Sequence, residues 1–160
     1  MTRRVFFSFH YERDIWRAGQ VRNSWVTKPD RETAGFIDAA SWEEVKRKGD
    51  EAIKRWIANQ LDGTSVTIVL IGAETANRDW VLYEIKESHK RGNGLLGIRI
   101  HNIKDQNQRM DNLGGNPFDK LYIEENGFKK YLSQIYPTYD WVRNDGYNNL
   151  GRWVEEVAPK

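Results

Sequence analysis

The segment SVTIVLIG, residues 65–72, constrains the fold more than any other part of the chain. Almost every residue in it is β-branched or apolar, so a strand formed by this segment needs cover on both of its faces. A strand with one face in water would instead alternate apolar and polar residues. The segment therefore predicts a central strand of a parallel sheet with helices on both sides.

The rest of the chain alternates predicted strands with predicted helices, which is typical of a parallel α/β sandwich of about five strands. Short apolar segments predict strands at 4–10, at 35–38, at 95–100 and at either 131–136 or 139–142. Helical spacing of apolar residues predicts helices at 12–27 (a weaker pattern), 41–61, 77–91 and 147–158. Turn-forming residues predict an irregular segment over 101–127. No linker or repeat divides the chain, so we expect residues 1–160 to form a single domain.

Cysteine is absent from the 160 residues, which excludes a disulfide framework, a thiolate nucleophile and a cysteine zinc site. Together with an N-terminus that lacks a signal peptide, this predicts a cytoplasmic protein. No apolar run is long enough to span a bilayer. The 25 basic and 23 acidic residues are interspersed, whereas a nucleic-acid groove needs a clustered basic face. We therefore expect neither a membrane nor a nucleic acid as partner.

One carboxylate, Glu84, lies inside the apolar segment RDWVLYEI, residues 78–85. Trp80 precedes it by four residues, so both side chains project from one face of the predicted helix. A carboxylate beside an indole ring is partly desolvated, and a charge acts more strongly where water is excluded. The alternative is a boundary glutamate that reaches water or pairs with Lys86 or a nearby arginine.

Ligands of parallel α/β sheets bind beyond the carboxyl ends of the strands. This rule selects Ser8, Phe9 and His10 after the first strand, Asp38 after the second, and the helix that follows Gly72. Ser8 and His10 share one side of their strand, as a nucleophile and its base would, but nothing in the sequence supplies an orienting acid or an oxyanion hole. The histidine spacings match no metal motif, and no phosphate-binding glycine loop is present. We therefore expect no metal.

Three stretches in this order resemble Toll/interleukin-1 receptor (TIR) domains: VFFSFH (5–10), FID (36–38) and SVTIVLIGAETANRDWVLYE (65–84). The third stretch contains the W-x-x-x-E signature of the family at Trp80 and Glu84. Further stretches, among them NPFD and YDWVRNDGYN, resemble the TIR-like proteins of the bacterial Thoeris antiphage system. The resemblance covers residues 4–100 best and implies a TIR/flavodoxin-like three-layer α/β sandwich around a parallel sheet.

The resemblance also implies an activity. Catalytic TIR domains cleave the bond between nicotinamide and ribose in NAD, which is their substrate, and Glu84 takes the place of their catalytic glutamate. The residues that would line the nicotinamide–ribose pocket are Ser8, Phe9, His10, Asp38 and Trp80. Thoeris TIR proteins make a cyclic ADP-ribose isomer that activates a ThsA-like effector. Many TIR domains also self-associate through the BB loop, which corresponds here to residues 39–49.

A single carboxylate suits this chemistry. Ordinary glycosidases need a second carboxyl group to protonate the leaving oxygen, but nicotinamide is attached as a pyridinium cation and leaves neutral. One negative charge in a dry site can bind the ribose and stabilise an oxocarbenium-like transition state. Two alternatives stay open. One is a non-catalytic TIR-like interaction scaffold. The other is a receiver domain, which needs an acidic cluster for Mg²⁺, and only Asp38 is evidently placed for that.

Overall fold

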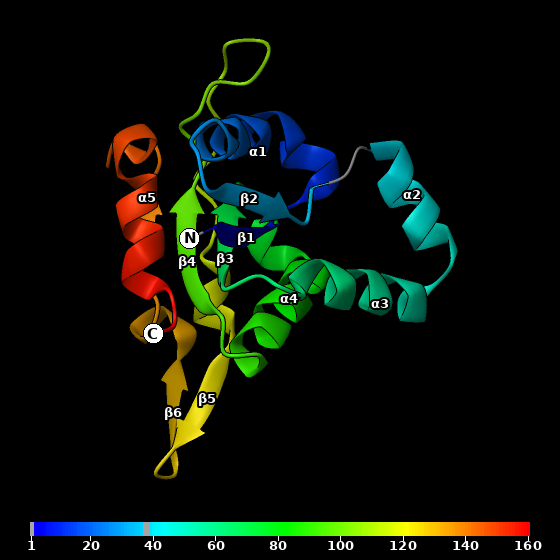
Figure 1. Ribbon diagram of the computed structural model, residues 1–160, viewed down its shortest axis with the longest axis vertical. Helices are drawn as coiled ribbons and strands as arrows, with labels where there is room; N and C mark the ends of the chain where they lie inside the picture. Colours follow the sequence, from blue (N-terminus) through cyan, green and yellow to red (C-terminus); the bar gives the residue numbers. More distant parts are fainter. Residues whose placement is uncertain (1, 37–38) are drawn as a thin grey trace.

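The computed structural model describes residues 2–36 and 39–160, and its centre is a five-stranded parallel sheet (Figure 1). The strands lie side by side in the order β2-β1-β3-β4-β7. Their bounds are β1 Arg3–Ser8, β2 Arg31–Ala34, β3 Val66–Ile71, β4 Gly94–Arg99 and β7 Thr138–Asp140. All six residues of β3 are buried, which confirms the central strand that the sequence predicts.

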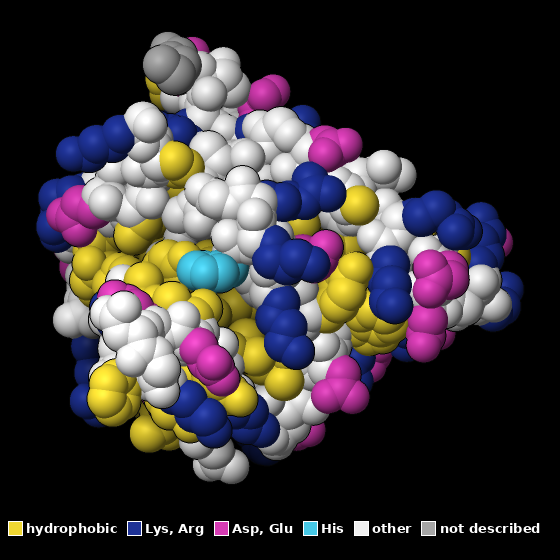
Figure 2. Space-filling model, turned by 90° about the horizontal axis from the view of Figure 1, so that it is seen from below, with side chains coloured by type: hydrophobic (Ala, Val, Ile, Leu, Met, Phe, Trp, Pro, Cys, Tyr) yellow, Lys and Arg dark blue, Asp and Glu magenta, His cyan; other side chains and the backbone are white. Residues whose placement is uncertain are grey.

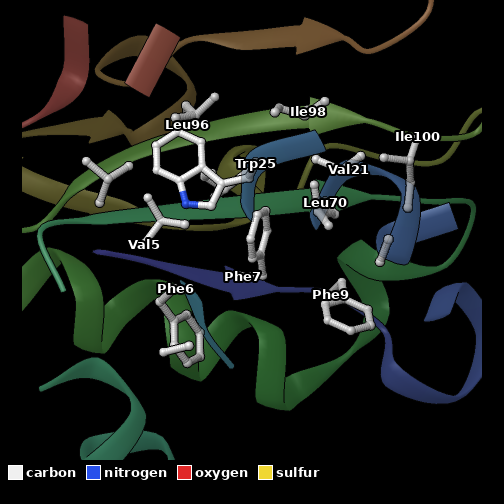
Figure 3. Packing of buried hydrophobic residues seen from close by; sticks show 14 of the residues in the cluster. Val5, Phe6, Phe7, Phe9, Val21, Trp25, Leu70, Leu96, Ile98 and Ile100 are labelled. Carbon is white, nitrogen blue, oxygen red and sulfur yellow. The ribbon is translucent and has the colours of Figure 1, made fainter. Parts of the chain in front are cut away.

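Helices cover both faces of the sheet. Helix α1 packs against α5 over one face, and α4 contacts β1, β3 and β4 on the other. The alternation of side chains along the strands divides the core in the same way: Phe7 points toward Trp25 of α1, whereas Phe6 points toward the opposite side (Figure 3). The bounds are α1 Tyr11–Val26, α2 Ala39–Arg47, α3 Asp50–Leu61, α4 Asp79–Lys90 and α5 Gly146–Val157. This arrangement confirms the three-layer α/β sandwich.

The second strand, β2, is Arg31–Ala34 and pairs in parallel with Arg3–Phe6. The prediction of this strand at 35–38 is wrong for Gly35 and Phe36, which follow β2, and residues 37 and 38 lie outside the described residues. β2 is an edge strand with a single neighbour in the sheet, so it tolerates polar residues that a central strand would not. Its sequence, RETA, therefore carries no apolar run that could reveal it. Beyond the strand, Phe36 packs against Phe7 with ring centroids 5.8 Å apart.

The predicted continuous helix over 41–61 is divided into α2 and α3. Gly49 separates them with φ 94° and ψ 175°, a conformation that only glycine adopts without strain. The break lets α2 project further from the sheet than any other helix (Figure 1). Trp42 of α2 and Ile53 of α3 both stay buried, which explains why their sequence pattern looks like one stripe.

The segment predicted as irregular over 101–127 contains more structure than expected. It holds the 3-10 helix η2, Pro117–Lys120, and strand β5, Tyr122–Glu125. β5 pairs antiparallel with β6, Phe128–Tyr131, in a hairpin that projects from the lower end of the molecule (Figure 1). Two further 3-10 helices are η1, Thr75–Asn77, and η3, Leu132–Gln134. Of the two candidates for the last strand, the one near 139–142 is correct, as β7.

Lys and Arg side chains are mixed with Asp and Glu side chains over the face seen in Figure 2, and hydrophobic side chains gather on one part of it. Within the described part of the chain, no helix is long and apolar enough to cross a membrane. The described residues also contain no group of three or more His, Cys, Asp or Glu side chains that could hold a metal ion.

Candidate active site

Glu84 is buried on the inner face of α4, with 1% of its surface exposed. Its Oε1 atom accepts a hydrogen bond of 2.7 Å from the Ser8 hydroxyl. Its Oε2 atom is also buried and has no hydrogen-bond partner among the described residues. A buried oxygen without a partner is costly, and such groups concentrate at functional sites. The alternative of a boundary glutamate that reaches water is therefore wrong.

The sheet and a pair of hydroxyl groups fix the position of Glu84. Ser8 is the last residue of β1, next to Val69 of β3, so its side chain faces α4. One turn beyond Glu84, the Ser88 hydroxyl donates to the Glu84 carbonyl oxygen at 2.7 Å. The Thr67 hydroxyl of β3 donates in turn to Ser88 Oγ at 2.7 Å. These contacts hold the helix against the sheet at the level of the carboxyl group.

Burial raises the pKa of Glu84 from its usual value of 4.5 to about 8, and the hydrogen bond from Ser8 opposes part of this shift. At neutral pH the group is therefore mainly a neutral acid as long as the site stays closed. A cation placed beside Oε2 would favour the ionised form, because an opposite charge nearby lowers the pKa of a carboxyl group. The site is consequently suited to a positively charged ligand.

Ser8→Ala is expected to raise the pKa of Glu84 further, by about one unit, since a hydrogen bond to a charged group contributes about 1.5 kcal/mol to the ionised form. The measurement is a ¹³C NMR titration of the Glu84 carboxyl carbon in both proteins. Ser24→Ala, which removes a hydroxyl group from α1 instead, should leave the titration unchanged. A midpoint that stays the same in Ser8→Ala would contradict the assigned role of Ser8.

Aromatic side chains seal the surroundings of Glu84. Burial raises the pKa of Tyr11 well above its usual value, and the charge of nearby Glu84 adds to the effect. The Tyr11 hydroxyl donates to the Gly35 carbonyl oxygen. Its ring packs against Trp42 of α2 at 4.7 Å between centroids and against Phe9 at 4.4 Å. Phe9, just after β1, together with Tyr11 of α1 and Trp42 of α2, thus forms one aromatic cover at this end of the sheet.

The structure brings only part of the predicted pocket into contact with Glu84. Phe9 belongs to the aromatic cover, 4.8 Å from Phe36 between ring centroids. His10 caps α1, its Nδ1 accepting from the Arg13 backbone N–H at 3.3 Å, and no His10–Ser8 contact appears among the described residues. Trp80 is half-buried and packs edge-on against Tyr83. Asp38 lies outside the described residues.

Sequence reasoning missed a charged cluster beside this pocket. Glu12 Oε1 accepts from Trp42 Nε1 at 3.1 Å, from Lys46 Nζ at 2.8 Å and from Arg78 Nη2 at 3.3 Å. The cluster joins the first turn of α1 to α2 and to the residue just before α4. Its signal in the sequence is slight, because α1, α2 and the residue before α4 contribute one charge each and no spacing rule connects them.

A second buried carboxylate, Asp14, was also missed. It is 1% exposed, and neither of its oxygens has a hydrogen-bond partner among the described residues. It lies against the backbone of Gly72, where a Cβ atom would come within 2.2 Å of Asp14 Oδ2. Burial raises the pKa of Asp14 from 3.8 to about 6, although Arg13 and Arg17 lower it in part.

Asp14→Asn is expected to stabilise the folded protein above pH 6. A carboxyl group whose pKa is raised on folding binds protons more tightly in the folded state, so stability is lost as pH rises from about 4 through 6. Asparagine does not ionise and escapes this loss, which amounts to about 3 kcal/mol at pH 7. Chemical denaturation at pH 4 and pH 7 should show a gain at pH 7 only. Asp62→Asn, at an exposed position, is the control and should not increase the free energy of unfolding at either pH. If Asp14→Asn increased the free energy of unfolding equally at pH 4 and pH 7, that result would contradict the raised pKa of Asp14.

The parallel sheet with order β2-β1-β3-β4-β7, together with a buried glutamate in a W-x-x-x-E helix after the central strand, defines a TIR-like domain. Comparison with known families agrees: the family described as "Thoeris protein ThsB, TIR-like domain" matches residues 6–105. The chain therefore belongs to the ThsB family of TIR-like Thoeris proteins. It is also 39% identical, over an alignment of 191 positions, to a Bacillus cereus (strain MSX-D12) protein named "Putative cyclic ADP-D-ribose synthase ThsB1". That alignment covers 96% of this chain and 100% of the relative.

Proposed function

We propose that this protein is a cytoplasmic enzyme that cleaves NAD at the nicotinamide–ribose bond and makes a cyclic ADP-ribose isomer. The product would signal to a ThsA-like effector in antiphage defence. The observation that carries the proposal is Glu84, a buried carboxyl group fixed by Ser8 through one oxygen, with the other oxygen unpartnered among the described residues. The name of the B. cereus relative supports the same type of product.

The proposed reaction begins with the cationic nicotinamide ring beside Glu84. The bond between the ring nitrogen and ribose C1′ breaks, and its electron pair goes to the nitrogen, so nicotinamide leaves as a neutral molecule. The positive charge moves to the ribose as an oxocarbenium ion. An ionised Glu84 stabilises this ion electrostatically, and it does so strongly because the site excludes water. Ser8 acts as a positioning residue that holds the carboxylate through Oε1.

Cyclisation and hydrolysis differ in the nucleophile that captures this ion. Water gives linear ADP-ribose, whereas an atom of the ADP portion of the same molecule gives a cyclic product and releases the proton. The aromatic cover of Phe9, Tyr11 and Trp42 favours the second outcome, because it limits the access of water. We propose that Trp80, His10 and Asp38 position the ribose, which follows from the family resemblance.

The closed conformation bears on the alternative function. Because Glu84 is 1% exposed, part of the cover must move before NAD can reach it. Self-association through residues 39–49, which include all of α2, would be one way to move it. The same closure favours a non-catalytic scaffold as the second candidate, in which Glu84 only maintains the fold.

Purified protein incubated with NAD at high protein concentration separates the two candidates. The enzyme proposal predicts time-dependent release of nicotinamide, detected by chromatography, together with a product one water lighter than ADP-ribose. The scaffold predicts unchanged NAD at every protein concentration and in every assembly state, and that result would contradict the proposed function.

A further inference from the structure

A small cavity lies next to the aromatic cover, where three helices meet. Its volume is about 340 Å³, and it is lined by Glu12, Lys46, Asn77, Arg78, Asp79 and Trp80. Two of these six side chains are cationic and come from different helical segments. The cavity thus combines positive charge, an amide and an aromatic wall, which together suit a nucleotide.

The two cations converge on a single carboxylate oxygen. Lys46 Nζ lies 2.8 Å from Glu12 Oε1, and Arg78 Nη2 lies 3.3 Å from the same atom. Lys46 also contacts Glu43 at 2.9 Å. The hydrogen bond with Lys46 lowers the pKa of Glu12, so Glu12 is ionised at neutral pH. Glu12 therefore places an anionic oxygen at the meeting point of an ammonium and a guanidinium group, as a phosphate oxygen would.

The cavity adjoins the candidate active site. Trp80, on its wall, precedes Glu84 by one turn of α4. Arg78 and Glu12 also lie close enough to His10, two residues after Ser8, to influence it: burial lowers the pKa of His10, the charge of Arg78 lowers it further, and Glu12 opposes them. In a dinucleotide the diphosphate is attached to the same ribose that carries nicotinamide. A binding site for the diphosphate must therefore lie close to the site for the reacting ribose. The cavity meets this requirement through Trp80, which lines it and precedes Glu84 by one helical turn.

We propose that Arg78 and Lys46 bind the diphosphate of the dinucleotide substrate, and that Glu12 occupies their binding position until substrate arrives. The proposal rests on the proposed function and extends it to a second part of the substrate. Arginine and lysine are the usual protein ligands of phosphate, arginine through its planar fork and lysine as a point charge. Asp79 would repel a phosphate group beside it, so the diphosphate belongs at the Lys46–Arg78 side of the cavity.

Replacement of Glu12 by a phosphate group would also loosen the aromatic cover. Glu12 is hydrogen-bonded to both Trp42 Nε1 and Lys46 Nζ of α2. When the phosphate groups bind Lys46 and Arg78, Glu12 loses its contacts to these two side chains. Helix α2 is then held less firmly to α1. Trp42 packs on Tyr11, which in turn lies next to Glu84. Binding of the diphosphate would thus loosen the aromatic cover at the moment when the reacting ribose needs access.

The test is calorimetric titration of ADP and of adenosine into the 160-residue chain carrying Glu84→Gln, which is expected not to turn over substrate. Arg78→Gln and Lys46→Gln should each weaken ADP binding about tenfold, the lower end of the range for a charged hydrogen bond. Glu12→Gln should tighten it, because the competing anion is gone. Adenosine binding should respond to none of the three. Lys90→Gln, which removes an exposed cation from the far end of α4, controls for the change in net charge and should leave ADP binding unchanged.

Tighter ADP binding in Glu12→Gln and weaker ADP binding in Arg78→Gln would support the proposal. If the cluster only maintained the fold, both substitutions would disturb it and ADP affinity would change in the same direction. The proposal is overturned if ADP does not bind, if the cation variants match Lys90→Gln, or if adenosine binding falls as much as ADP binding. These outcomes are independent of turnover. A wild-type chain that releases no nicotinamide, yet shows the predicted ADP affinities, would contradict the proposed enzyme and leave the diphosphate site supported.

Discussion

Glu84→Gln is expected to abolish nicotinamide release from NAD and, at the same time, to make the folded protein more stable at alkaline pH. The loss of activity should be about 10³-fold or more, because the variant lacks the one charge that would stabilise the oxocarbenium ion in a dry site. Glutamine has nearly the same shape as the protonated glutamate, so the hydrogen bond from Ser8 can be kept. Chromatographic quantification of nicotinamide measures the first effect.

The gain in stability follows from the raised pKa of Glu84. This pKa is about 8 in the folded chain and 4.5 in an exposed carboxyl group, so the wild-type protein loses stability as pH rises from about 4.5 through 8. Glutamine does not ionise and avoids the loss, which we expect to reach about 4–5 kcal/mol at pH 8.5. For a chain of this size that corresponds to a rise of about 10–18 °C in Tm. At pH 4.5 the two proteins should unfold at nearly the same temperature.

Glu87→Gln is the matched control, since it changes a partly exposed glutamate on the same helix. It should retain activity and show no stabilisation that depends on pH. An active Glu84→Gln variant would contradict the catalytic role. A variant that is inactive but destabilised at pH 8.5 would indicate that Glu84 is ionised and stabilising in the closed structure, which is incompatible with a raised pKa.

The second large effect is on the pH dependence of the proposed activity in the wild-type protein. kcat/KM reports the ionisation of the free enzyme, in which about 1% of Glu84 is ionised at pH 6 and about half at pH 8 if its pKa is about 8. We therefore expect kcat/KM for NAD to rise about tenfold per pH unit between pH 6 and 7.5, and to level off above pH 8.

Initial rates of nicotinamide release at low NAD concentration, from pH 5.5 to 9, provide this measurement. In Ser8→Ala the levelling should move to higher pH, because the hydrogen bond that favours the ionised form is gone. A rate that is constant from pH 6 to 9, or that falls as pH rises, would contradict the proposal that the ionised carboxylate is the active form.

The sequence predicted the features that depend on local pattern. The segment of β3, almost continuously β-branched or apolar, was enough to predict a parallel sheet. Glu84 was singled out by its position in an apolar segment, and its catalytic role by the resemblance to TIR domains. β2 escaped detection because an edge strand can be polar. The break at Gly49 was missed because an apolar stripe continues across it. That residues 1–160 form one domain stays a prediction.

The site was less predictable than the fold. Ser8 was expected near Glu84, and the hydrogen bond between them agrees with that expectation. The burial of Asp14 and the convergence of Lys46 and Arg78 on Glu12 depend on how α1, α2 and α4 meet. The contacts of Glu12 join residues up to 66 positions apart, and no sequence period connects them. The roles of Phe9, His10, Asp38 and Trp80 in substrate binding stay predictions.

The central claim, that Glu84 cleaves NAD into a cyclic signal, is tested most directly by mass analysis of nucleotides. The samples are extracts of phage-infected cells that express either the wild-type chain or Glu84→Gln at equal levels. We predict, in the wild type alone, depletion of NAD and a product with the mass of ADP-ribose minus one water. Identical nucleotide profiles in the two strains throughout infection would contradict the claim.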